Sequence, residues 1–218
     1  MQISAKQWIA RSRNSLVFYE NKLPYKERQF NHVFQLADYF GPMIGARTHV
    51  KIADLGAGMF STTGSTWPTA QVELYPSDIL AREYYDILKK HHVTRLFRVE
   101  YQNMEALPYP DGMFDIVHCA NAIDHCHDPA LALREMNRVC KQDGYIHLRH
   151  FVENGAFQQY GGTHLWNLTP TGDGDCSFWK PNGSKFLLSN YFANFTVTLE
   201  RLGAKEMPAV ICTIRKGQ

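Results

Sequence analysis

The chain has 218 residues, enough for one domain with a small appended element. Its 23 Lys and Arg residues nearly balance its 21 Asp and Glu residues, giving a formal net charge of +2, so charge does not indicate a nucleic-acid partner. No apolar run approaches the roughly 18 residues of a membrane span, and residues 1–20 lack the apolar centre of a secretory signal. We therefore expect a globular protein with no membrane partner.

The number and spacing of the cysteines indicate the redox state of the cellular compartment in which the protein works. The chain has five cysteines, an odd number, at wide spacings and without a CxxC motif: Cys119, Cys126, Cys140, Cys176 and Cys212. This pattern favours neither a disulfide framework nor a thiolate zinc site. It predicts a reduced, cytoplasmic protein.

Residues 1–46 predict a helical N-terminal extension. Apolar residues recur there at the i, i+3, i+4, i+7 spacing of a buried helix face: Phe30, Val33, Phe34, Ala37 and Phe40. We expect this second helix of the extension to end at Gly41-Pro42, because these two residues interrupt the helical pattern.

Residues 47–150 alternate strand-like with helix-like segments. The strand-like runs are 50–55, 72–75, 95–100, 114–119 and 145–150. One helix is expected over 79–92, and another begins at Pro129, where Asp128 precedes it as an N-cap. This alternation predicts a doubly wound α/β fold with a mostly parallel sheet.

The remaining residues predict a loop and an edge hairpin. Residues 151–182 contain five glycines and two prolines, and a stretch of this kind is usually a functional loop or lid. Residues 183–218 are expected to form a short helix (184–193) and a strand hairpin (195–200 and 209–215). The hairpin brings the predicted sheet to seven strands within a single domain.

A glycine-rich turn follows the first strand, at Asp54-Leu55-Gly56-Ala57-Gly58. Glycines there let the backbone turn sharply and approach a ligand. The full GxGxxG fingerprint of a dinucleotide site is absent, because Ser61 stands in the third glycine's place. Asp78 follows about 20 residues after Gly58, a spacing at which a carboxylate can accept both hydroxyls of a ribose. The alternatives are an ordinary tight turn and, for Asp78, a helix cap before Ile79.

Polar residues also follow the third and fourth strands. Asn103-Met104 comes where the chain leaves the third strand, so that a polar side chain there meets an adenine edge. The loop 121–129 after the fourth strand contains Asn121, Asp124, His125 and His127. That set invites a metal interpretation, but a two-residue histidine spacing in a loop is not specific. A polar loop with a helix cap is the preferred interpretation, and no metal site is expected.

The order of these motifs, from ADLGAG through Asp78 to NMEALPYPDGMFDIVHCANAIDHCHDPALALREMNRVCKQDGYIHLRH, closely resembles the class I S-adenosylmethionine-dependent methyltransferases. Within them it resembles the subgroup that includes quinone-biosynthesis methyltransferases. The resemblance covers about residues 50–150. It implies that Asp54, Gly56, Ala57 and Gly58 line the methionine end of S-adenosylmethionine.

The resemblance also assigns the nucleoside end. It implies that Asp78 holds the ribose, that Ile79 packs on adenine, and that Met104 donates its backbone N–H to the ring. Asn103 stands where the family often has an Asp facing the adenine amino group. Asn121 is placed near the methionine moiety and the acceptor. One departure is Phe60, which stands where the family's common motif has a third glycine.

The acceptor is expected to be a small molecule methylated on oxygen or nitrogen. The sulfonium already activates the methyl group, so the protein mainly aligns the reactants for in-line displacement. Loops at the carboxyl ends of the strands would supply any base or acceptor-orienting group, with His150 and His164 as candidates. Contacts to the acceptor are expected from His125, Tyr160, Trp166 and Asn167. For Trp166 and Trp179, the alternative is that they pack in the hydrophobic core.

Two other functions remain open at this point. One is a non-catalytic S-adenosylmethionine-binding module that regulates a partner. The other is a nicotinamide-dependent oxidoreductase, against which the incomplete glycine fingerprint and the segment after the third strand argue.

Overall fold

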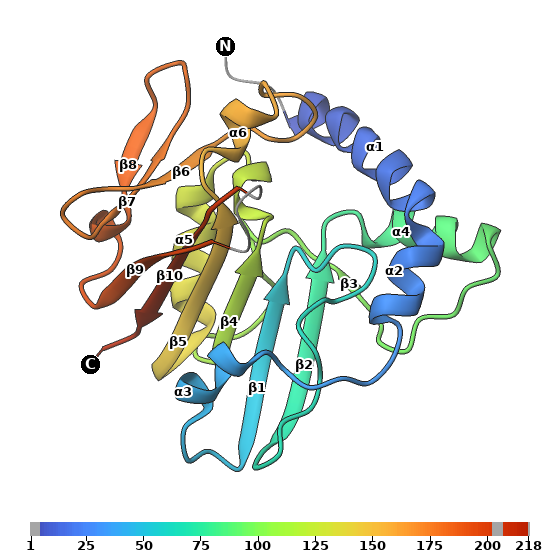
Figure 1. The fold of residues 1–218 in the computed structure, drawn as a ribbon, viewed down its shortest axis with the longest axis horizontal. Coiled ribbons are helices and arrows are strands. Elements are labelled where there is room, and N and C mark those ends of the chain that lie inside the picture. Colours follow the sequence, from blue (N-terminus) through green and yellow to red (C-terminus); the bar gives the residue numbers. More distant parts are fainter. Residues whose placement is uncertain (1–4, 202–206, 218) are drawn as a thin grey trace.

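The computed structural model describes residues 5–201 and 207–217, and in it a seven-stranded sheet forms the centre of the molecule (Figure 1). The strand order is β3-β2-β1-β4-β5-β10-β9. Every neighbouring pair is parallel except the two that involve β10, which runs antiparallel to β5 and β9. The strands are β1 His49–Leu55, β2 Gln71–Asp78, β3 Glu100–Tyr101, β4 Phe114–Ala120, β5 Cys140–Phe151, β9 Phe195–Glu200 and β10 Ala209–Arg215.

This topology confirms the predicted doubly wound, mostly parallel sheet with an antiparallel edge hairpin. The predicted third strand, 95–100, is wrong in its bounds, because only Glu100–Tyr101 pairs with β2. The predicted second strand is longer than expected and runs to Asp78 itself.

Both faces of the sheet are covered. In β1, Val50 and Ile52 pack into one apolar cluster, whereas Ala53 and Leu55 pack into the other. This alternation follows from the two-residue period of a strand. The first cluster includes residues from the segment 36–44, and the second includes the buried face of α5 (Pro129–Val139).

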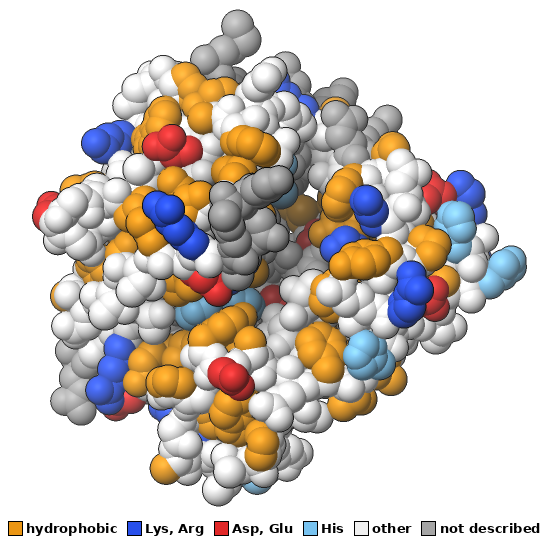
Figure 2. All heavy atoms as spheres, in the orientation of Figure 1, with side chains coloured by type: hydrophobic (Ala, Val, Ile, Leu, Met, Phe, Trp, Pro, Cys, Tyr) orange, Lys and Arg blue, Asp and Glu red, His pale blue; other side chains and the backbone are white. Residues whose placement is uncertain are grey.

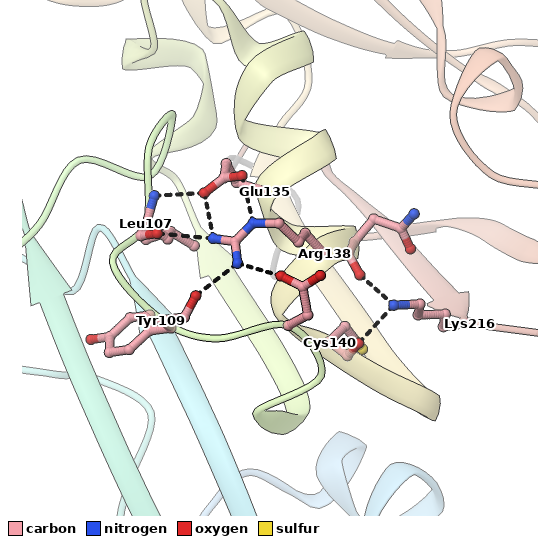
Figure 3. Close-up of polar contacts among 8 residues, drawn as sticks. Leu107, Tyr109, Glu135, Arg138, Cys140 and Lys216 are labelled. Atoms are coloured by element: carbon pink, nitrogen blue, oxygen red, sulfur yellow. Dashed lines mark hydrogen bonds and ion pairs between the residues drawn. The ribbon is translucent and has the colours of Figure 1, made fainter.

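Helix α5 begins where its sequence indicates, and it ends at Val139, so β5 starts five residues before the predicted 145. The Asp128 side chain accepts a hydrogen bond from the Ala130 N–H, 3.0 Å away, which confirms the predicted N-cap. Near the other end, the Arg138 guanidinium donates to the carbonyls of Leu107 and Tyr109 and to the Glu135 carboxylate (Figure 3). These contacts fix the loop after β3, which carries part of the site described below.

The N-terminal extension contains two helices, α1 (Ala5–Asn21) and α2 (Leu23–Phe30). The predicted helix over Phe30–Phe40 is wrong: α2 ends at Phe30, and a 3₁₀ turn, Asp38–Phe40, leads into α3 (Gly41–Ile44). Gly41-Pro42 therefore begins a helix instead of ending one, because proline is well placed in a first helical turn. Backbone bonds hold the middle of this segment extended, because the Phe34 carbonyl accepts from the Ser65 N–H and the Leu36 N–H donates to the Thr66 carbonyl.

Residues 151–193 are also more ordered than predicted. They contain α6 (Asn154–Phe157) and a three-stranded antiparallel sheet of β6 (Asn167–Pro170), β7 (Cys176–Trp179) and β8 (Lys185–Leu187). This small sheet lies beyond the β9–β10 edge of the main sheet (Figure 1). The predicted loop over 151–182 and helix over 184–193 are thus wrong as structural assignments.

The connection from β1 to β2 and helix α4 (Ala81–Lys90) complete the described fold. All five cysteines are free and buried. Within the described residues, no helix combines the length and the apolar character that a membrane crossing requires.

Candidate functional site

A pocket opens at the carboxyl ends of β1, β2 and β4, between the sheet and helix α1. It encloses about 690 Å³, including solvent at its mouth. Figure 2 shows the surface hollowed near the centre of this face. The lining residues come from α1, from the end of β2, from the loops after β1, β2, β3 and β4, from α4 and from the segment before β6: Ser12, Ser15, Tyr19, Gly56, Ser77, Asp78, Ile79, Leu80, Tyr84, Gln102, Asn103, Met104, Glu105, Asn121, Ala122, His125, Cys126 and Thr163.

The glycine turn after β1 closes tightly on the end of β2. The N–H groups of Gly56 and Ala57 donate to the Ser77 carbonyl at 2.8 and 2.9 Å. Gly56 has φ +72°, and a Cβ there would lie 2.3 Å from the Cβ of Ala122. Only glycine therefore fits at this position, and the missing side chain leaves backbone exposed to the pocket.

Asp78 links the turn to the next helix. Its Oδ2 accepts from the Gly58 N–H at 2.9 Å, and its Oδ1 accepts from the Leu80 N–H at 2.8 Å. Burial raises the pKa of Asp78 to about 6, and these two backbone bonds oppose the shift. Asp78 lines the pocket, and it is not the N-cap of α4 (Ala81–Lys90), because Leu80 occupies that position.

Asp54 lies behind the turn and does not line the pocket. Its Oδ2 accepts from the Ser61 hydroxyl at 2.6 Å, and burial raises its pKa to about 6. Ser61, which breaks the glycine fingerprint, is therefore a partner of the acid that precedes the turn. Ala57 and Gly58 are also outside the lining, and the Tyr19 phenol lies over Gly58.

Residues at the far wall of the pocket come from the loops after β2 and β3. Ile79, Asn103 and Met104 all line the pocket. The Asn103 Oδ1 accepts from the Glu105 N–H at 3.0 Å, so this side chain shapes its own turn. Glu105 in turn accepts from the His127 N–H at 2.7 Å, which ties this loop to the one after β4.

The other end of the pocket is formed by a cluster around the carboxylate of Asp124. Asp124 is fully buried, and three imidazoles surround it: those of His125, His150 and His164. Burial opposes a negative charge there, but the histidines outweigh it and hold the pKa of Asp124 below its ordinary value. The sequence predicts all three histidines as residues that contact the acceptor or act on it, and the structure brings the three together around Asp124.

The three histidines differ in access. His150 is 1% exposed, its Nε2 lies 2.7 Å from Asp124 Oδ1, and its Nδ1 lies 2.8 Å from the Phe151 carbonyl. Both nitrogens lie within 2.8 Å of oxygens inside the protein and the ring is buried, which argues against direct contact with an acceptor. His125 lines the pocket, and His164 lies against it with its Nδ1 3.1 Å from His125 Nε2.

Three residues predicted to contact the acceptor have structural partners. Asn167 is fully buried, donates to the Tyr160 hydroxyl at 2.9 Å and accepts from the Ala156 N–H at 2.8 Å. Trp166 is 5% exposed and packs against Phe186. Tyr160, Trp166 and Asn167 all lie outside the pocket lining, and their contact with an acceptor stays a prediction.

Several site residues escaped the sequence analysis. Ser12, Ser15 and Tyr19 reach the pocket from α1, and Thr163 reaches it from the segment before β6. The α1 residues lie about 40 positions before the glycine turn, and no motif marks them. Thr163 directly precedes His164, and that proximity was the available signal.

Comparison with known proteins agrees with this geometry. A family described as a methyltransferase domain matches residues 54–148. The uncharacterized methyltransferase YcgJ of Bacillus subtilis is 31% identical over 161 residues, which are 71% of this chain and 62% of that protein. The ubiquinone/menaquinone biosynthesis C-methyltransferase UbiE of Shewanella sp. (strain ANA-3) is 32% identical over 115 residues, 49% of this chain and 45% of that protein.

Among solved structures, the CMeT domain of the citrinin polyketide synthase shares the fold with a TM-score of 0.51 and 15% identity. The match covers 78% of this chain and 47% of that one. The chain spans less than two thirds of the length of the curated relatives YcgJ and UbiE. In fold, motif order and the residues that the family model matches, the chain is similar to methyltransferase domains.

Proposed function

We propose that this chain binds S-adenosylmethionine in the pocket and transfers its methyl group to a small-molecule acceptor. The observation that carries the proposal is the joining of Gly56 and Asp78 in one pocket at the strand ends. A glycine turn with exposed backbone and a buried carboxylate on the next strand is the arrangement that a nucleoside with a charged tail requires.

The residues present fit this cofactor. The Asp78 carboxylate would accept the ribose hydroxyls, and Ile79 and Met104 would contact the adenine. Gly56 and Asn121 would lie along the methionine tail, with Asp54 behind the turn. When bound, the cofactor supplies an activated methyl group, and the protein needs chiefly to align the acceptor and exclude water.

We place the acceptor at the Asp124 end of the pocket. His125 and Thr163 line the pocket there and His164 adjoins it, so polar groups face the side opposite the ribose contact. His125 and His164 would orient the acceptor, whereas His150 would position Asp124. The acceptor atom is proposed to be oxygen or nitrogen, in contrast to the C-methyltransferase named among the relatives.

The five buried thiols fit a reducing compartment, and we propose a cytoplasmic location on that ground.

Isothermal titration calorimetry tests the proposal. We expect saturable binding of S-adenosylmethionine and of S-adenosylhomocysteine, and no heat with NAD. Binding of NAD without binding of either sulfur compound would contradict the proposal and favour an oxidoreductase. A non-catalytic binding module would bind both sulfur compounds yet release no S-adenosylhomocysteine when a panel of small hydroxyl and amine acceptors is added.

A further inference from the structure

Three side chains at the acceptor end converge on one point. His164 Nδ1 lies 2.8 Å from Asp124 Oδ2 and 3.1 Å from His125 Nε2. His125 Nε2 lies 3.4 Å from Asp124 Oδ1. One oxygen and two imidazole nitrogens, one from each of the three residues, lie within 4.8 Å of one another.

The two separations that His164 Nδ1 makes, to Asp124 Oδ2 and to His125 Nε2, are close to the edges of a metal coordination sphere. Ligands held about 2.0–2.2 Å from a zinc ion lie roughly 2.9–3.4 Å apart at angles between octahedral and tetrahedral. Two imidazoles and one carboxylate are also a donor set that zinc and neighbouring first-row metals prefer.

Hydrogen bonds alone cannot satisfy all the polar atoms of this cluster at once. A neutral imidazole nitrogen carries either a proton or a lone pair. A single proton on His164 Nδ1 cannot point fully at both Asp124 Oδ2 and His125 Nε2. The Asn154 Nδ2, which is itself a donor, also lies 3.1 Å from His164 Nδ1. A cation would satisfy the carboxylate and both lone pairs at once.

We propose that Asp124, His125 and His164 bind a divalent first-row transition-metal ion, with zinc the preferred occupant. This assignment reverses the sequence-based expectation of no metal site. That expectation was tied to His125 and His127 in one loop, whereas the third ligand is His164, which lies 39 residues after His125.

The surroundings are those of an oriented metal site. His150 lies against Asp124 Oδ1 at 2.7 Å and is itself fixed by the Phe151 carbonyl. Partners of this kind hold a ligating carboxylate in place and tune its charge. Asp124 is wholly buried, so its orientation is set by the protein and not by solvent.

The site deepens the proposed function. Three protein ligands leave a coordination position open, as in catalytic zinc sites, and His125 places that position beside the pocket. If the chain is a methyltransferase, an acceptor with a hydroxyl or amine group would bind there. Binding of the metal itself does not depend on that function.

Equilibrium dialysis against Zn²⁺ and the absorption spectrum of the Co²⁺-loaded full chain test the site. We expect one ion per chain and visible Co²⁺ bands of a site with nitrogen ligands. His125→Asn and His164→Asn remove one ligand each from side chains that are only partly buried, and we expect each to weaken Zn²⁺ binding at least 100-fold.

His127→Asn is the matched control, because His127 lies in the same loop but outside the three-residue set. We expect it to bind Zn²⁺ as the unaltered chain does. Thermal unfolding and calorimetry with S-adenosylhomocysteine in each variant separate loss of the metal from loss of the fold or of the cofactor pocket. A folded chain that binds neither ion at micromolar concentration, or equal binding by all variants, would overturn the assignment.

Discussion

The two ends of the pocket are built in different ways. At the cofactor end, Gly56 and Asp78 come from the ends of adjacent parallel strands, and their backbone and side-chain bonds lock the two loops together. At the acceptor end, Asp124 and His164 come from segments 40 residues apart. The Asp124 carbonyl accepts from the N–H groups of Leu165 and Trp166, and the Asp124 carboxylate contacts His164. Backbone bonds thus join the loops at both ends, and what distinguishes the acceptor end is a buried carboxylate surrounded by three imidazoles.

The largest loss of cofactor affinity is expected from Gly56→Ala. The new methyl group would overlap the Ala122 side chain, and φ +72° strains any residue other than glycine. We expect cofactor binding to fall below detection and stability to drop by about 2–4 kcal/mol. Gly172→Ala is the control, because a Cβ there has no neighbour within 4 Å. Calorimetry measures the affinity and chemical denaturation measures the stability. An unchanged affinity in Gly56→Ala would contradict a cofactor site built on the backbone of this turn.

The next effect is expected from Asp78→Asn, which keeps the shape of the side chain but removes its charge. Hydrogen bonds to a charged group contribute about 1.5–3 kcal/mol, so the dissociation constant of S-adenosylhomocysteine should rise tenfold or more. Glu73→Gln, a substitution of the same kind on the same strand, should change the affinity less than twofold. Equal affinities in the two variants would remove Asp78 from the cofactor site.

A smaller effect is expected from pH. Because burial raises the pKa of Asp78 to about 6, the carboxylate gains a proton as pH falls through 6, and a neutral group accepts ribose hydroxyls less well. Cofactor affinity should therefore be constant above about pH 7 and should fall up to about tenfold by pH 5, following the fraction of Asp78 that is ionised. Asp54 titrates in the same range, so Asp78→Asn should flatten most of this dependence but not all of it. An affinity that rises toward low pH would contradict the assignment.

The smallest effect on cofactor affinity is expected from Asn167→Ala. This change leaves the Ala156 N–H without its buried partner, and the expected cost is about 1–3 kcal/mol of stability. The affinity for S-adenosylhomocysteine should stay within twofold, since Asn167 does not line the pocket. Asn182→Ala, at an exposed turn, is the control and should alter neither quantity. A loss of cofactor affinity without a loss of stability would return Asn167 to the site.

The contrast between the two ends also explains what the sequence could predict. The turn residues Gly56 and Asp78 follow strands whose apolar patterns are clear, and parallel strands bring their carboxyl ends to one edge. Their positions were therefore predictable from local spacing. The roles of Tyr160, Trp166 and Asn167 were not, because polar and aromatic residues suit both a ligand and the interior of the small sheet that β6 joins.

Two further features lay beyond local patterns. Tyr19 covers Gly58 from a helix whose sequence has no motif linking it to the turn. Burial of Asp124 by three histidines requires that two loops meet in space, which no spacing along the chain specifies. The two helix errors, at 30–40 and 184–193, have the same origin. Backbone pairing with distant residues, 65–66 in the first case and β7 in the second, overrides the helical spacing there.

We propose that the pocket holds the cofactor between these two ends. A crystal structure of the chain with S-adenosylhomocysteine is the direct test. The account predicts the ribose hydroxyls within hydrogen-bond distance of Asp78, the adenine against Ile79 and Met104, and the sulfur beside Gly56 with its open side toward the Asp124 cluster. A cofactor bound with its sulfur facing away from His125 and His164, or bound outside this pocket, would contradict the account.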